Sequence, residues 1–373
     1  MFRIDFYLYR IHRYNNKYFH TNYSISLYKM SRIYLIRFIG FCLTSVALIR
    51  RLIWLFTVYP FSQKAKLITR TRKSPPATLQ NKRWGEHKYI KFDNGIKLHY
   101  VEKGDPSRPM MVFLHGFPEF WFLWRHQIEH FSKHYWCIAP DNRGYGDSDK
   151  PDGIENYHIS MLVDDVKNLV NGLGRSHCIL VAHDWGGAIG YQFAEHYPQM
   201  VKTYIPINMP HPASLMRERE RSWEQALKSW YIMMFQCPWI PEQMLRFADL
   251  DIFDNILSDA KISKNGKNEN VDEVTEAFKY TFSPPGAFTP PLNYYRNIIQ
   301  FYGPVKSSKK ITVPVLSIFG TGDKALSVAA AKGGADFVEN FQTILLDGVS
   351  HWSPEETPDE INQHIDNHLK SFK

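Results

Sequence analysis

The sequence predicts an α/β fold in which helices cover both faces of a mostly parallel sheet. Continuous apolar runs such as Met110–Leu114 have the composition of buried strands, and segments such as Ser160–Leu173 have the apolar spacing of amphipathic helices. The two kinds of segment alternate along the chain, and such alternation is typical of parallel strands joined by helical crossovers. With 373 residues, of which 44% are hydrophobic, the chain can build one large domain of this class or two smaller ones.

The N-terminal part predicts an attachment to a membrane. We divide it into an extension (1–32), a membrane segment (33–61) and a linker (62–85). A spanning helix needs about 20 apolar residues. The pair Arg50-Arg51 interrupts this segment, and a central arginine costs roughly 2.5 to 3.5 kcal/mol. A single-pass anchor and an interfacial anchor both remain open, and so does the side of the membrane on which the domain lies. Either Met1 or Met30 could be the true start.

The net charge of +8 and the four cysteines limit the classes of partner. Much of the positive excess lies in the first 83 residues, which is typical of a membrane-flanking region and does not indicate a nucleic-acid surface. Cys42, Cys137, Cys178 and Cys237 show no CxxC spacing. The cysteines therefore predict neither a disulfide framework nor a cysteine metal site.

The first part of the predicted core covers residues 86–212. It opens with two alternating runs joined by Asn94-Gly95, a pair that favours a hairpin turn because both residues tolerate positive φ. The expected strands are Tyr89–Phe92, Ile96–Val101, Met110–Leu114, Tyr135–Ala139, Cys178–Val181 and Val201–Ile207, and the expected helices are Trp121–Ser132, Ser160–Leu173 and Ala188–Ala194.

The alternation then stops, and residues 213–305 predict an inserted helical cap rich in Trp, Met and Phe. Helices are expected over Trp223–Phe235 and Val271–Phe282, with a polar loop over Ser263–Asn270. The second part of the core, 306–373, resumes the sheet and closes on a helix. Its expected elements are the strands Val315–Phe319 and Phe341–Leu346 and the helix Pro358–Phe372.

Asp184 stands at the sharp turn between a predicted strand and a predicted helix. The small residues Ala182 and Gly186 lie two positions before and after it, the spacing of a nucleophile elbow. A carboxylate at the apex attacks saturated carbon and forms an ester. Asp323 and His351 each follow a later strand, in the order nucleophile, acid, histidine that such a sheet requires.

Five spaced motifs carry a family resemblance. They are His115–Pro118, Arg143–Ser148, His183–Gly187, Trp230–Gln236 and Leu292–Asn297. From about Tyr89 to its end the chain resembles the epoxide hydrolases of the α/β-hydrolase superfamily, and with its N-terminal apolar segment it most resembles their membrane-anchored branch. The resemblance implies an α/β-hydrolase fold with an inserted helical cap, preceded by a membrane segment.

The resemblance also implies the roles of individual residues. Asp184 would open the epoxide, His351 would activate water, and Asp323 would orient the imidazole. Tyr231 and Tyr295 would donate hydrogen bonds to the epoxide oxygen, with Tyr294 as the alternative to Tyr295.

The backbone N–H groups of Phe117 and Trp185 would form the oxyanion hole, and their side chains would contact the substrate. The expected reaction turns lipophilic epoxides, such as fatty-acid epoxides, into vicinal diols at a membrane, expected to be the endoplasmic reticulum. No cofactor, metal or nucleic acid is expected. A haloalkane dehalogenase, a serine-type esterase and a catalytically silent lipid-binding protein are the alternatives, and Asp184 disfavours the esterase.

One further motif predicts a different chemistry. His126, Glu129 and His130 have the H-x-x-E-H spacing of a zinc protease helix. Because they fall inside a helix that the fold already requires, we interpret them as solvated helix residues without zinc.

Overall fold

The structure is a computed structural model that describes residues 35, 38–43, 45–46, 49–50, 69–262, 269–300 and 310–372. Several predicted segments lie outside these residues. They are the extension, which includes Met1 and Met30, most of the membrane segment, and most of the polar loop. In the part of the chain that the structure describes, no helix is long and apolar enough to cross a membrane.

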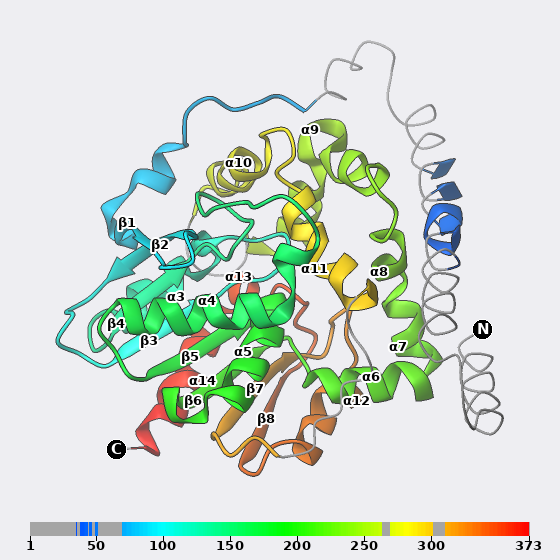
Figure 1. Ribbon diagram of the computed structural model, residues 1–373. Helices are drawn as coiled ribbons and strands as arrows, with labels where there is room; N and C mark the ends of the chain where they lie inside the picture. Colours follow the sequence, from blue (N-terminus) through cyan, green and yellow to red (C-terminus); the bar gives the residue numbers. More distant parts are fainter. Residues whose placement is uncertain are drawn as a thin grey trace, which may run out of the picture.

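The described residues form one eight-stranded sheet of order β1-β2-β4-β3-β5-β6-β7-β8 (Figure 1). Pairing is antiparallel between β1, β2 and β4 and parallel from β4 through β8, so the predicted mostly parallel sheet is confirmed. The strands are β1 (Glu86–Lys91), β2 (Lys97–Lys103), β3 (Met110–Leu114), β4 (Trp136–Pro140), β5 (Cys178–His183), β6 (Val201–Ile207), β7 (Val315–Gly320) and β8 (Phe341–Leu346).

The central strands β3, β4 and β5 are buried at every position, as expected for parallel strands covered on both faces. Helix α4 (Ile159–Gly172) lies beside α5 (Asp184–His196), and α3 (Arg125–Phe131) lies beside α14 (Pro358–Lys370). In Figure 1 the first pair crosses the front of the sheet and α14 lies behind it. Short helices α12 (Val328–Lys332) and α13 (Ser353–Glu356) follow β7 and β8.

Between β6 and β7 the chain forms a set of helices over one edge of the sheet (Figure 1). These are α6 (Pro212–Arg221), α7 (Trp223–Lys228), α8 (Trp230–Met234), α9 (Ile240–Asp259), α10 (Val271–Phe282) and α11 (Thr289–Gln300). The prediction of one helix over Trp223–Phe235 is wrong, because Ser229 leaves α geometry at φ −89° and ψ 10° and separates α7 from α8. Its hydroxyl and its backbone N–H both donate to the Gln225 carbonyl, at 2.9 and 3.1 Å.

Residues 69–85, the described part of the predicted linker, pack against the rest of the fold. Leu79 and Trp84 are buried in the main core. Arg70 and Arg72 both bind Asp249 of α9, and Arg72 also binds Glu276 of α10. These two arginines therefore bind the segment to the cap helices. The sequence had suggested that the positive charges of this region flank a membrane.

Candidate active site

Asp184 is the first residue of α5 and follows β5 directly. Its φ of 47° is left-handed, which is uncommon for a residue with a side chain and indicates a strained turn held by its surroundings. Two glycines make this close packing possible. A Cβ on Gly116 would come within 2.4 Å of the Asp184 Cβ, and a Cβ on Gly186 within 2.3 Å of the Leu114 carbonyl oxygen.

His351 and Asp323 reach Asp184 from the loops after β8 and β7. His351 Nδ1 lies 2.7 Å from Asp323 Oδ2, and its Nε2 lies 3.6 Å from Asp184 Oδ2. The Asp323 side chain is fully buried, and the other two are nearly so. The structure therefore brings together the three residues that the sequence predicted, with the imidazole between two carboxylates.

The charges of these groups depend on one another. Burial alone would raise the pKa of both carboxyl groups, yet His351 holds the pKa of Asp184 and of Asp323 below the ordinary value. Burial lowers the pKa of His351, but Asp323 and Asp184 together raise it well above the ordinary value. The resting site at neutral pH consequently holds an imidazolium between two ionised carboxylates.

Further residues hold Asp323 in place, and the sequence reasoning missed them. Asn208 Nδ2 donates to Asp323 Oδ2 at 2.9 Å. The backbone N–H groups of Ala325 and Leu326 donate to the other carboxylate oxygen at 2.7 and 2.9 Å. From α7, Lys228 Nζ donates to the Asp323 carbonyl oxygen at 2.9 Å. Asn208 could have been found, because it follows β6 at the same edge of the sheet as Asp184 and Asp323.

The loop after β3 lies against the Asp184 carboxylate. The backbone N–H of Phe117 donates to Asp184 Oδ1 at 2.9 Å. Glu119 accepts from the Gly116 N–H at 2.7 Å and contacts His183 Nδ1 at 3.0 Å. Glu119 is buried, so it fixes the loop that carries the Phe117 donor.

Trp185 lies in the first turn of α5, where backbone N–H groups have no partner within the helix. Its ring lies edge-on to Tyr295 with centroids 5.1 Å apart, and Phe117 lies 5.3 Å from the same ring. Tyr231 of α8 packs against Tyr295 of α11 at 5.9 Å. Both cap tyrosines thus lie among the aromatic side chains next to Asp184.

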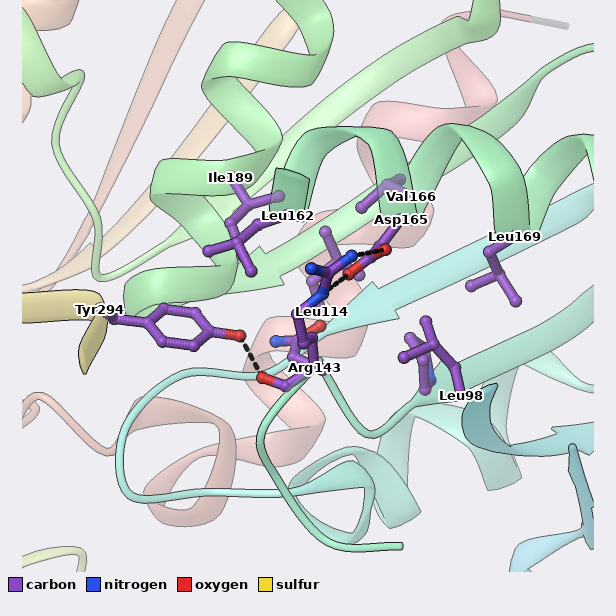
Figure 2. Close-up of a pocket in the computed structure, with 11 residues that line it drawn as sticks. Leu98, Leu114, Arg143, Leu162, Asp165, Val166, Leu169, Ile189 and Tyr294 are labelled. Carbon is purple, nitrogen blue, oxygen red and sulfur yellow. Dashed lines mark hydrogen bonds and ion pairs between the residues drawn. The ribbon is translucent and has the colours of Figure 1, made fainter. Parts of the chain in front are cut away.

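Tyr294 points elsewhere. Its hydroxyl donates to the Arg143 carbonyl oxygen at 2.6 Å, and Figure 2 shows the ring aimed at the loop after β4. Arg143 itself binds Asp165 of α4 through two bonds of 2.7 Å. Tyr294 and Tyr295 both contact the Trp185 ring, with centroids 5.4 and 5.1 Å away. The hydroxyl of Tyr294 is held by the Arg143 carbonyl, and Tyr295 is the one that also contacts Phe117.

Both cap tyrosines keep their protons at neutral pH. Burial is the largest cause that raises the pKa of Tyr231 and of Tyr295 far above the ordinary value, and the negative charge of Asp184 raises both further. Two neutral phenols beside a carboxylate can donate hydrogen bonds to an oxygen that becomes negative.

The interpretation of His126 as a solvated residue is wrong. His126 is buried and lies 3.0 Å from Glu269 Oε2, which also accepts from the fully buried Arg125. Arg125 binds Glu355, four residues after His351, through two bonds of 2.6 Å. The helix that bears the H-x-x-E-H motif therefore takes part in a buried ion-pair network that joins the core to the cap.

No group of three His, Cys, Asp or Glu side chains in the described ranges is arranged to hold a metal ion. A surface hollow of about 460 Å³ opens between α9 and the two loops that carry Asp323 and His351. Its lining includes Ile256 of α9, Lys324 and Trp352.

The fold and the residues gathered at Asp184 define an α/β hydrolase, and a family model described as "alpha/beta hydrolase fold" matches residues 109–236. Epoxide hydrolase 3 of Xenopus tropicalis is 40% identical over 302 residues, which cover 80% of this chain and 82% of that protein. Epoxide hydrolase 4 of Homo sapiens is 38% identical over 80% of this chain and 83% of its own length. The chain belongs to the epoxide hydrolase family of this superfamily.

Solved structures agree with this assignment. The epoxide hydrolase of Bacillus megaterium in complex with an inhibitor is 34% identical, with a TM-score of 0.68, over 76% of this chain and all of that chain. An epoxide hydrolase of Vigna radiata is 32% identical, with a TM-score of 0.66, over 78% of this chain and 99% of its own.

Proposed function

We propose that the protein hydrolyses lipophilic epoxides to vicinal diols through a covalent ester on Asp184. The observation that carries the proposal is the arrangement around Asp184. One carboxylate oxygen accepts from the Phe117 N–H, the other lies 3.6 Å from His351, and two neutral cap phenols lie in the aromatic cluster beside it.

In the first step a carboxylate oxygen of Asp184 attacks a ring carbon and the carbon–oxygen bond of the epoxide breaks. The leaving oxygen develops the charge of an alkoxide and takes a proton from Tyr231 or Tyr295. The raised pKa values of both phenols keep these protons available at neutral pH.

In the second step His351 takes a proton from water, and the hydroxide attacks the carboxyl carbon of the Asp184 ester. The negative oxygen of the tetrahedral intermediate is met by the backbone N–H groups of Phe117 and Trp185. Collapse releases the diol, whose leaving oxygen takes the proton of the newly formed carboxyl group, and regenerates the carboxylate. His351 keeps the proton taken from water, which restores the imidazolium of the resting site. The water oxygen stays on Asp184.

The first step prepares His351 for the second. In the free enzyme the charge of Asp184 helps to hold the imidazole protonated. Ester formation makes Asp184 neutral and removes that contribution, so the pKa of His351 falls. The imidazolium can then give its proton to the tyrosinate left by the first step, and the neutral imidazole acts as a base when the ester needs water.

Aromatic side chains around Asp184 favour a lipophilic substrate. Phe117 contacts Phe235 and Phe288 of the cap edge-on, with centroids 5.6 and 6.4 Å apart. We further propose that residues 33–61 attach the protein to a membrane, the endoplasmic reticulum, where such substrates dissolve. Fractionation of cells that express the full chain tests this attachment, and recovery of the protein in the soluble fraction would refute it.

Two other functions compete with this proposal. A haloalkane dehalogenase uses the same Asp-His-Asp residues, and Trp185 could contact a halide. Tyr231 and Tyr295 favour the epoxide, because a halide leaves as a stable anion and needs no proton. A silent lipid-binding protein would not require the charged pair of Asp184 and His351 in a buried site, where each charge is costly unless paired.

Incubation of the purified full chain with a fatty-acid epoxide, with styrene oxide and with a 1-haloalkane separates these functions. We expect diols from the epoxides and no halide release. Halide release without diol formation would show that the protein is a dehalogenase. A folded protein that is inactive on every compound would support a catalytically silent lipid-binding protein.

A further inference from the structure

Large apolar side chains are exposed on one side of the cap. Twelve large hydrophobic residues are exposed in the described part of the chain, and nine of them lie in only two segments. Four lie within residues 223–239 of the cap, and five lie within residues 35–49. Their concentration in two segments contrasts with the scattered single exposures that are normal on a protein surface.

The cap members form a regular pattern. Trp223 and Leu227 lie at i and i+4 of α7, the spacing of one helix face, and Trp230 opens α8 after the break at Ser229. Their exposures are 78%, 68% and 47%, and Trp239 before α9 is 69% exposed. On the opposite face Gln225 is fully buried. These helices thus bury a polar residue against the core loops and present tryptophan and leucine to the outside.

The second segment lies against the same part of the cap. Gly40 is buried, and a Cβ there would come within 2.3 Å of the Met233 carbonyl oxygen of α8. The helical residues 38–43 therefore touch the backbone of α8, and Figure 1 draws them beside it. Phe38 and Phe41, on either side of this contact, are 64% and 52% exposed.

We propose that a face of exposed apolar side chains lies in the surface layer of a lipid bilayer. It consists of Trp223, Leu227, Trp230 and Trp239 of the cap together with Phe38, Phe41, Val46 and Ile49. Three of the four cap members are tryptophan, the side chain that favours the boundary between headgroups and acyl chains. A helix face of tryptophan and leucine binds a membrane surface through its buried apolar area and needs no spanning helix.

The lysine beside this face is bound by other groups of the protein. Lys228 of α7 is paired with Glu224 at 3.1 Å and with two backbone carbonyls, so it offers no free positive charge to acidic lipids. Trp230 also precedes Tyr231 directly. If the proposed chemistry holds, a substrate dissolved in the bilayer would reach the cap at the element that carries one of its proton donors.

A spin-label depth measurement tests the face without any use of the catalytic activity. The full chain, with exposed Cys42 replaced by serine, receives a nitroxide at Leu227→Cys and is reconstituted in phosphatidylcholine vesicles. We expect collisions with oxygen to dominate over collisions with a water-soluble nickel chelate. The matched control Leu345→Cys, on the exposed part of β8, should show the reverse.

Two results would overturn the proposal. A label at residue 227 that collides mainly with the nickel chelate faces water. A label that is shielded from both reagents lies against protein, such as a second copy of the chain. If the proposed chemistry also holds, the double change Trp223→Ser and Leu227→Ser raises the apparent KM for a bilayer-dissolved epoxide at least about tenfold and leaves kcat for a short water-soluble epoxide unchanged. Equal loss on both epoxides would count against the face.

Discussion

Asp323→Asn isolates the second step of the proposed reaction. In the native protein one oxygen of Asp323 accepts from the N–H groups of Ala325 and Leu326, and the other faces His351 and Asn208. Because the two backbone donors require an acceptor, the amide oxygen of Asn must face them and its NH2 group must face His351. His351 Nδ1 then accepts, and its only proton moves to Nε2, which can no longer take a proton from water.

The structure also gives the size of the effect. The substitution removes a hydrogen bond to a charged imidazole, worth about 1.5 to 3 kcal/mol, and leaves a buried donor of Asn208 opposed to another donor, at about 1 to 3 kcal/mol. Ester hydrolysis should slow by about 10² to 10⁴-fold, since each 1.36 kcal/mol is tenfold in rate. Ester formation should be far less affected, because Asp184 supplies the nucleophile itself.

Rapid mixing followed by acid quench and intact mass measurement distinguishes the two steps. We expect Asp323→Asn to accumulate the ester on Asp184 at nearly the native rate and to release diol slowly. Asp336→Asn, on the exposed surface, is the matched control and should turn over normally. Unchanged steady-state turnover in folded Asp323→Asn, or loss of ester formation as large as the loss of hydrolysis, would refute the reasoning.

Three further predictions concern the donors, the ion pairs and the pH profile. Tyr231→Phe and Tyr295→Phe should each slow ester formation in single-turnover assays by about 10² to 10³-fold, whereas Tyr294→Phe should keep the native rate, since that hydroxyl binds the Arg143 carbonyl. Glu355→Gln should cost about 3 to 5 kcal/mol of unfolding free energy in urea titrations, because it leaves a buried arginine partly unpaired; a loss under 1 kcal/mol would contradict this. The lowered pKa of the nucleophilic aspartate keeps it ionised in mildly acidic solution, so kcat/KM should persist to low pH. By contrast, kcat should fall at a higher pH, because hydrolysis of the ester requires the histidine base to be unprotonated. If kcat and kcat/KM fell at the same acidic pH, this difference between the two steps would be excluded.

Much of the fold could be predicted because its central strands are buried on both faces and read as continuous apolar runs. Met110–Leu114, Val201–Ile207, Phe341–Leu346 and the helix Val271–Phe282 have the predicted bounds. Asp184, Asp323 and His351 were found because each follows a strand at the same edge of a parallel sheet.

The remaining features depend on contacts that periodicity does not encode. Ser229 separates α7 from α8, and a polar residue with helical neighbours gives no sign of this in the sequence. His126 looks like a solvated residue until Glu269, 143 positions later, is folded against it. Glu119 lies three residues after Gly116, but only the fold brings His183 to its carboxylate.

The most direct test of the covalent mechanism follows oxygen from water. A single turnover of a lipid epoxide with excess enzyme in heavy-oxygen water should place the label in the Asp184 carboxylate and leave the diol unlabelled, as read by mass spectrometry of the peptide that contains Asp184. Label in the diol with none on Asp184 would mean that water attacks the epoxide directly, and the account of Asp184 as the nucleophile would be wrong.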